Sequence, residues 1–181
     1  MYSLSTTSHF VALSYVWGAA RQKKLTRINW DVLSHAGSLD ASDVPATIWD
    51  TMVLTKSLGE KYCWIDALCI LQDDPAREQD QISQMGATYS RALITIVNTA
   101  GDGSTGPPGL HACSRDIQQI KFQLPEFDLI KVQDDTDIYG DSRHNISVWE
   151  NRTWTYRERL FSKRLIIFRK QQIYWHFRSA T

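Results

Sequence analysis

The sequence predicts an α/β fold in which a mainly parallel sheet is flanked by helices. Four short runs are almost wholly apolar, and segments with helical spacing of apolar residues separate them. The strands of a parallel sheet are covered by helices on both faces, so they appear as continuous apolar runs. Strands that alternate with helices are typical of such sheets. We expect the strands near residues 11–16, 62–66, 93–97 and 164–168.

The first strand and the first helix are marked by the residues at their ends. FVALSYVWG, residues 10–18, is an apolar run that stops at a glycine, which predicts a buried strand and a tight turn. Residues 19–43 are polar and predict mostly loop. Pro45 suits a first helical turn and Gly59 suits a helix end, so a helix is expected between them. Its buried face would carry Val44, Ile48, Met52 and either Thr55 or Leu58.

The middle of the chain continues this alternation. YCWIDALCI, residues 62–70, begins as a strand and carries one charge, Asp66, in an apolar setting. Asp74 and Pro75 are typical of a helix start. The helix that follows has apolar residues at helical spacing, namely Ile82, Met85 and Tyr89. LITIV, residues 93–97, is the third strand.

The last part of the chain contains an insertion and then the end of the sheet. The glycine-rich residues 100–109 predict a loop, and the segment near 100–150 is an insertion in which IKFQL and LIKV form a small hairpin. WTYRERLFS predicts a short helix, RLIIF a buried strand and QIYWHF a final edge strand. No repeat and no domain boundary is visible, so residues 1–181 are expected to form a single domain.

The composition argues against several classes of protein. The 20 Lys and Arg residues are balanced by 20 Asp and Glu residues, whereas a nucleic-acid binder needs an excess of positive charge. No apolar run approaches the roughly 20 residues of a membrane span, and the N-terminus does not resemble a secretory signal. The 3 cysteines form no CxxC pair, which predicts reduced thiols and no metal site in a cytoplasmic protein.

The predicted topology also indicates where a ligand would bind. Open parallel sheets bind ligands beyond the carboxyl ends of their strands. The polar and aromatic residues at two of these ends are Ser14, Tyr15, Trp17, Gly18 and Asp66. Trp154 and Glu158 stand one helical turn apart on the helix before the last buried strand, so we expect them near the same rim. The sequence therefore predicts an aromatic cluster and two carboxylates in one cleft.

Four blocks of the chain resemble, in order, the motifs of the fungal heterokaryon incompatibility (HET) domain. They are ALSYVWG, VPATIWDTMVLTKSLGEKYCWIDALCILQDD, QMGATYSRALITIVNTAG and RTWTYRERLFSKRLIIF. The resemblance runs from about Phe10 to Phe168. Val16 stands where the family usually has cysteine, and Arg157 stands where glutamine is common. The resemblance implies a module of fungal non-self recognition, in a family whose members trigger cell death when incompatible strains fuse.

The HET domain has itself been likened to the Toll/interleukin-receptor (TIR) domain, and three features of this chain resemble TIR domains. Ser14 and Tyr15 resemble the SY that ends the first TIR strand, Asp66 resembles the Asp that ends the second, and residues 154–158 resemble the WCxxE block. The resemblance implies a TIR-like, flavodoxin-like fold, from which the insertion departs. It also implies self-association and an upstream sensor domain or partner protein.

In TIR enzymes the glutamate of this block serves the cleavage of NAD between nicotinamide and ribose. The resemblance therefore implies that Glu158 is catalytic and that NAD is a substrate, with no cofactor required. The substrate-binding residues it implies are Ser14, Tyr15, Trp17, Gly18, Asp66 and Trp154.

Each of these residues also has a structural interpretation. Glu158 would form a surface ion pair with Arg152, Arg157 or Arg159. Asp66 would accept hydrogen bonds from backbone N–H groups of the following turn or form a salt bridge with an arginine, because a buried charge needs partners. Trp17 and Tyr15 would pack on the rim instead of stacking on a ring, and Trp154 would lie in the core.

For the whole domain, the alternative to a nucleotide hydrolase is a non-enzymatic adaptor that acts through self-association and partner recruitment. A fold of this kind serves both roles, so the fold alone does not decide. A hydrolase requires the Glu158 carboxylate to be exposed in a pocket that also reaches residues 14–18.

Overall fold

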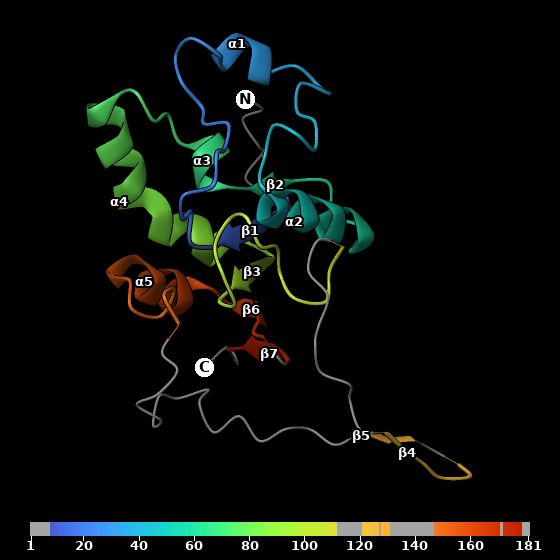
Figure 1. Cartoon of the computed structure of the whole chain (residues 1–181). Coiled ribbons are helices and arrows are strands. Elements are labelled where there is room, and N and C mark those ends of the chain that lie inside the picture. Colours follow the sequence, from blue (N-terminus) through green and yellow to red (C-terminus); the bar gives the residue numbers. More distant parts are fainter. Residues whose placement is uncertain (1–7, 112–120, 127, 131–146, 171, 179–181) are drawn as a thin grey trace.

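The computed structural model describes residues 8–111, 121–126, 128–130, 147–170 and 172–178. Its centre is a five-stranded sheet with the order β2-β1-β3-β6-β7 (Figure 1). The strands are β1 (Val11–Ser14), β2 (Cys63–Trp64), β3 (Ile94–Asn98), β6 (Arg164–Phe168) and β7 (Ile173–Phe177). The first four are parallel, and β7 pairs antiparallel with β6 at the edge. The predicted α/β fold with a mainly parallel sheet is therefore confirmed, and the strand order is that of flavodoxin-like folds.

Helices cover both faces of this sheet. Figure 1 shows α4 (Pro75–Arg91) and α5 (Thr153–Phe161) side by side on one face, and α2 (Ala46–Ser57) on the other. Two single-turn helices, α1 (Trp30–Leu33) and α3 (Asp66–Cys69), lie in the connections. In the described part of the chain, no helix is long and apolar enough to cross a membrane.

The core follows the two-residue period of the strands. Val11 and Leu13 of β1 point to the α2 face, where they pack with Ile48 of α2. Ala12 points to the opposite face and packs with Tyr89 of α4. Ser14, the last residue of β1, belongs to this second face, because side chains alternate along a strand. The strand thus delivers a hydroxyl beneath α4 and α5.

The buried face of α2 is the predicted one, and it is wider than predicted. Val44, Ile48 and Thr55 are buried, and Leu58, the alternative to Thr55, follows the last helical turn and is 45% exposed. Thr47 and Thr51 are fully buried as well. The hydroxyl of Thr51 donates to the carbonyl of Thr47, and that of Thr55 donates to the carbonyl of Thr51. These bonds within the helix satisfy the hydroxyl groups, so polar residues occupy a core position that hydrophobicity alone does not predict.

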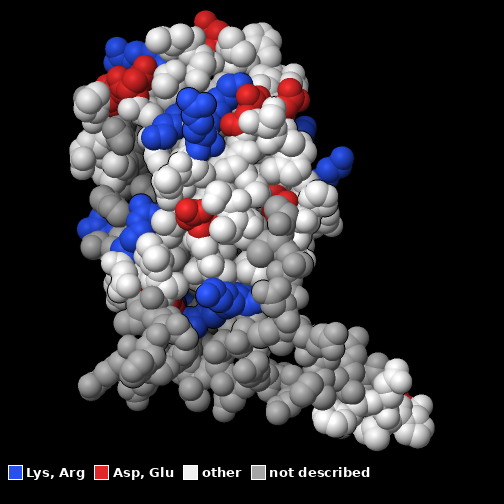
Figure 2. Space-filling view, viewed as in Figure 1, with Lys and Arg blue, Asp and Glu red and all other residues white. Residues whose placement is uncertain are grey.

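Two further elements of the sequence analysis are confirmed. β4 (Lys121–Gln123) and β5 (Asp128–Ile130) form the small antiparallel hairpin expected in the insertion. β7 is the expected edge strand. β2 is shorter than predicted, because Asp66 already begins α3. Over the described part of the face in Figure 2, positive and negative side chains are interspersed, in keeping with the formal net charge of zero.

The loop after β3 is held at the carboxyl edge of the sheet. The Thr47 amide donates to the carbonyl of Gly103 at 3.0 Å, and the Thr47 hydroxyl donates to the carbonyl of Asp102 at 2.8 Å. Gly18 lies against the same loop with φ at 65°, and a Cβ added to it would stand 2.2 Å from Oδ2 of Asp102. Gly18 therefore permits both the turn after β1 and its close contact with this loop.

We predict that Gly18→Ala lowers the free energy of unfolding more than Gly37→Ala does. Both glycines have positive φ, but an added Cβ at Gly37 meets nothing within 4 Å. Gly37→Ala should therefore cost only the conformational strain, about 1–2 kcal/mol. Gly18→Ala should cost about 1–3 kcal/mol more, because Asp102 has to move. Urea denaturation measures both values, and equal losses would contradict the close packing.

Candidate functional site

The Glu158 side chain is buried between α5 and the end of β1. It is 9% exposed, and its Oε2 accepts a hydrogen bond from the hydroxyl of Ser14. Ser14 itself is almost fully buried. The expectation of a surface ion pair for Glu158 is therefore wrong. The reason is geometric: Glu158 lies on the face of α5 that packs on the sheet, directly over the last residue of β1.

Two aromatic side chains complete the surroundings of the carboxylate. Trp149 is buried, and its Nε1 donates to the Ser14 hydroxyl at 2.8 Å. Tyr89 of α4 is also buried, and its hydroxyl donates to the carbonyl of Leu13 at 3.1 Å. Neither residue is among those that the sequence predicts for the site. In the sequence, Tyr89 is only one of the apolar residues at helical spacing. Trp149 falls in the segment predicted as an insertion, and its position just before the helix is the one sequence feature that could have pointed to the site.

Burial changes the protonation of Glu158. The pKa of its carboxyl group is raised from 4.5 to about 7, mainly by desolvation and in smaller part by the nearby charge of Asp66. The hydrogen bond from Ser14, the nearby hydroxyl of Tyr89 and the positive charge of Arg152 act in the opposite direction. The carboxyl group is therefore close to half ionised at neutral pH.

Asp66, the first residue of α3, is the second carboxylate of the site. Its Oδ1 accepts a hydrogen bond from the backbone N–H of Ala67 at 2.7 Å, and its Oδ2 accepts one from Nε1 of Trp17 at 2.8 Å. The expected bond to the following turn is thus present. Burial raises the Asp66 pKa from 3.8 to about 6 in spite of these bonds.

A pocket of about 200 Å³ lies between these groups, and we call it the rim pocket. Its lining consists of Tyr15, Trp17, Asp66, Ile70, Gln72, Ile82, Met85, Arg152, Thr155 and Glu158. It unites four of the residues predicted for the site, two of them aromatic and two acidic. The Trp17 indole is held by Asp66, and Nζ of Lys24 lies 4.5 Å from its ring centre. The hydroxyl of Tyr15 donates to Oε1 of Gln22 at 2.7 Å.

Three of the predicted site residues lie elsewhere. Ser14 stands behind Glu158 as its hydrogen-bond donor, and Gly18 contacts Asp102 of the loop after β3. Trp154 is in the first turn of α5, but its side chain lies outside the described residues.

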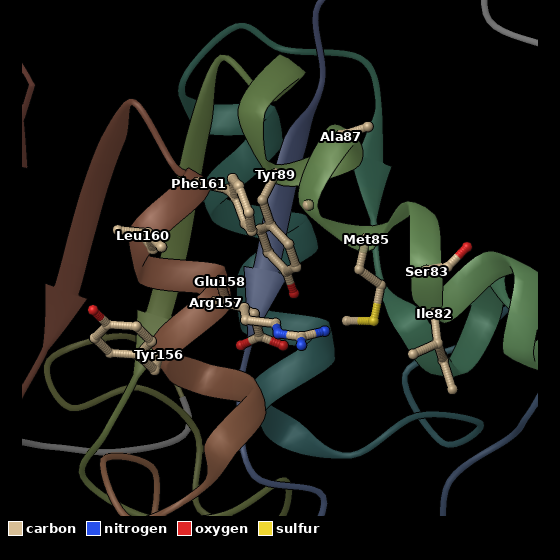
Figure 3. Close-up of a pocket in the computed structure, with 11 residues that line it drawn as sticks. Ile82, Ser83, Met85, Ala87, Tyr89, Tyr156, Arg157, Glu158, Leu160 and Phe161 are labelled. Carbon is tan, nitrogen blue, oxygen red and sulfur yellow. The ribbon is translucent and has the colours of Figure 1, made fainter.

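A second pocket, of about 470 Å³, lies between α4 and α5, and we call it the helix pocket. It is lined by Ile82, Ser83, Met85, Gly86, Ala87, Tyr89, Tyr156, Arg157, Glu158, Leu160 and Phe161 (Figure 3). Figure 3 shows Tyr89 with its hydroxyl directed toward Glu158, and Arg157 extending from α5 toward α4. No sequence pattern indicated this pocket, because the packing of two helices creates it.

The cysteines of the described residues do not provide a nucleophile. Cys63 and Cys69 are free thiols, and burial raises their pKa values to about 12 and about 11. Both therefore remain protonated at neutral pH, whereas a nucleophilic cysteine acts as a thiolate. Cys113 lies outside the described residues. Among the residues that the structure describes, no group of three or more His, Cys, Asp or Glu could hold a metal ion.

We predict that, as pH rises, the free energy of unfolding of the Glu158→Gln variant increases relative to that of the native protein. The folded-state pKa of about 7 lies above the unfolded value of 4.5, so the folded protein binds the proton more tightly. The native protein accordingly loses stability between about pH 4.5 and pH 7, by about 3 kcal/mol in total. The amide does not titrate. The stability difference between the two proteins should change by about 2–3 kcal/mol between pH 5 and pH 8.

Urea denaturation at both pH values measures this difference. The control is Glu126→Gln, since the Glu126 side chain is exposed, and this variant should follow the native protein. A constant difference between Glu158→Gln and the native protein would show that Glu158 is not a buried acid of raised pKa.

A family model described as "Heterokaryon incompatibility protein (HET)" matches residues 10–158 of the chain. No curated protein and no solved structure gives a match. The matched segment includes β1, β2, β3 and their connecting helices, and it ends on Glu158. It thus contains both carboxylates and both aromatic residues of the rim pocket. Because the match covers most of the chain, the chain belongs to the heterokaryon incompatibility (HET) family.

Proposed function

We propose that this domain is a cell-death effector of heterokaryon incompatibility that hydrolyses NAD between nicotinamide and ribose, as TIR-like enzymes do. Membership of the HET family suggests the role in heterokaryon incompatibility. The enzymatic part rests on one observation: two carboxylates of raised pKa, the buried Glu158 and the half-buried Asp66, line one pocket together with two aromatic side chains. Raised pKa values of this kind are typical of functional sites.

The chemistry requires one well-placed carboxylate. The bond between ribose C1′ and the pyridinium nitrogen breaks, and its electron pair neutralises that nitrogen, so nicotinamide leaves without a general acid. The remaining ribosyl cation resembles the oxocarbenium ion of glycoside hydrolysis. The ionised Glu158 would stabilise this cation, because fixed charges are most effective in a water-poor site. The oxygen of a water molecule then bonds to C1′, and its proton is lost to the carboxylate or to solvent.

The rim pocket offers suitable contacts for the leaving group. Nicotinamide is a flat ring that carries positive charge while it is attached to ribose. The Trp17 indole, oriented by its hydrogen bond to Asp66, provides an aromatic surface for such a ring. Asp66 and Glu158 provide the opposite charge. Two cations are close by, since Arg152 lines the same pocket and Lys24 lies over the Trp17 ring. The pocket also reaches Tyr15 and Trp17, which is one of the two conditions for a hydrolase. The other condition is an exposed Glu158 carboxylate, and here Glu158 lines the pocket but is 9% exposed.

The adaptor interpretation is the alternative, and a specific observation favours it. Large apolar side chains are exposed on α5 and on the edge strand β7, among them Tyr156 at 68% and Phe177 at 60%. Exposed apolar residues of this kind serve self-association and partner recruitment when they gather in a patch. In that case Glu158 would serve only to hold α5 on the sheet.

We predict that concentrated native protein releases nicotinamide from NAD and that Glu158→Gln lowers kcat by about 10²–10³. The amide keeps the shape of the side chain but loses the charge that acts on the transition state, so kcat should fall more than KM rises. Nicotinamide release is measured at several protein concentrations, because self-association would promote activity. Thermal melting confirms folding, and Glu126→Gln is the matched control on an exposed glutamate.

Two results would decide against this function. If the folded Glu158→Gln protein releases nicotinamide with the kcat of the native protein, Glu158 is not catalytic. A native protein that releases no nicotinamide, even when it is artificially clustered, would favour the adaptor interpretation.

We also predict that kcat/KM rises with pH through a value near 7. Only the ionised Glu158 stabilises the cation, and its pKa in the free protein is about 7. Asp66→Asn should move this rise to lower pH, because the charge of Asp66 raises the Glu158 pKa. A rate that falls between pH 6 and pH 8 would mean that the protonated carboxyl group acts instead.

A further inference from the structure

Glu158 lines both pockets of the site. The rim pocket and the helix pocket also share two side chains of α4, Ile82 and Met85. The two pockets therefore meet at the carboxylate, where α4 and α5 face each other (Figure 3). A ligand held at Glu158 can extend into both pockets. Met85 lies between the two pockets, and its flexible side chain can move to make room for such a ligand.

The two pockets differ in charge. The rim pocket has two carboxylates, Asp66 and Glu158, in its lining and one lining cation, Arg152, while Lys24 lies over the Trp17 ring. In the helix pocket, Arg157 is the cation and the shared Glu158 is the carboxylate. A guanidinium group binds phosphate oxygens well, through two parallel hydrogen bonds. The rim pocket thus suits a cationic ring and the helix pocket suits a phosphate.

The two pockets also differ in size and in the character of their walls. The helix pocket, at about 470 Å³, is more than twice as large as the rim pocket, at about 200 Å³. Its walls include the rings of Tyr89 and Phe161, and Figure 3 shows them close together above Glu158 and Arg157. Phe161 is 43% exposed, whereas Tyr89 is buried, so it is the Phe161 ring that can accept a nucleobase by stacking.

We propose that the helix pocket is a second subsite, which binds the phosphate-bearing nucleoside half of a dinucleotide while the rim pocket holds the nicotinamide ring. This inference rests on the proposed function, since it assigns the two halves of the same substrate. Arg157 binds the diphosphate, and Phe161 contacts the base. The ribose whose bond to nicotinamide breaks lies at Glu158, where the two pockets meet. Nicotinamide is therefore left in the rim pocket and ADP-ribose in the helix pocket.

The test uses ADP-ribose, which contains the phosphate-bearing half and lacks the nicotinamide. Isothermal titration calorimetry measures its Kd for the native protein, Arg157→Gln, Phe161→Ala and the control Arg159→Gln. Arg159 is on the same helix and lies outside the lining of both pockets. Arg159→Gln therefore removes the same charge as Arg157→Gln without changing either pocket. Arg157→Gln should fold well, because the side chain is exposed and glutamine is common at this position in the resembling family.

We expect Arg157→Gln to raise the Kd for ADP-ribose by about 10–100-fold, the usual effect of losing charge-assisted hydrogen bonds. Phe161→Ala should raise it by about 5–100-fold, the range for loss of one stacking partner. Arg159→Gln should leave it unchanged. In the NAD assay, KM should rise in the first two variants.

The outcomes separate this inference from the proposed function. Equal Kd values in all four proteins, or no binding of ADP-ribose at millimolar concentration, would overturn the subsite even if NAD is hydrolysed. The expected pattern of Kd values without any NAD hydrolysis would support the subsite and contradict the enzymatic function.

Discussion

The hydrogen bond from Ser14 to the buried Glu158 is the interaction on which the arrangement of the site depends. It joins the end of strand β1 to the middle of α5, two segments that are far apart in the chain. The Ser14 hydroxyl also accepts a bond from Trp149, so one small side chain positions the carboxylate and the segment that leads into α5. A protein that needed only a tie between helix and sheet would be more stable with an uncharged partner here. The retained carboxyl group therefore suits a chemical role.

The fold was predictable because its local signals are strong and agree with one another. Wholly apolar runs marked the parallel strands, and the alternation with helices gave the fold class. The prediction was incomplete where hydrogen bonding overrides hydrophobicity. Thr47 and Thr51 of α2 are buried because the Thr51 hydroxyl donates to a carbonyl of its own helix and the Thr47 hydroxyl donates to the loop after β3.

The site was predictable only in part, and topology explains which part. The rule that ligands bind at the carboxyl ends of strands brought Tyr15, Trp17 and Asp66 together with Glu158. This rule does not identify residues that contact the site from other segments, such as Trp149. Trp149 lies in a segment without a clear pattern, and its contact with Ser14 depends on how the chain returns to the sheet. The direction of a side chain within a packed interior is a property of the whole fold.

The point at which the family match ends has a consequence for how the domain can be cut. The match stops at residue 158, within α5, yet the next strand pairs with β3 along its length, from Thr95 and Leu165 to Asn98 and Phe168. A protein shortened to the matched segment would leave β3 as an open edge with unpaired backbone groups. Such edges pair readily with other chains. Clustering of a shortened protein would then reflect exposed backbone, and only a chain that includes β6 and β7 can report genuine self-association.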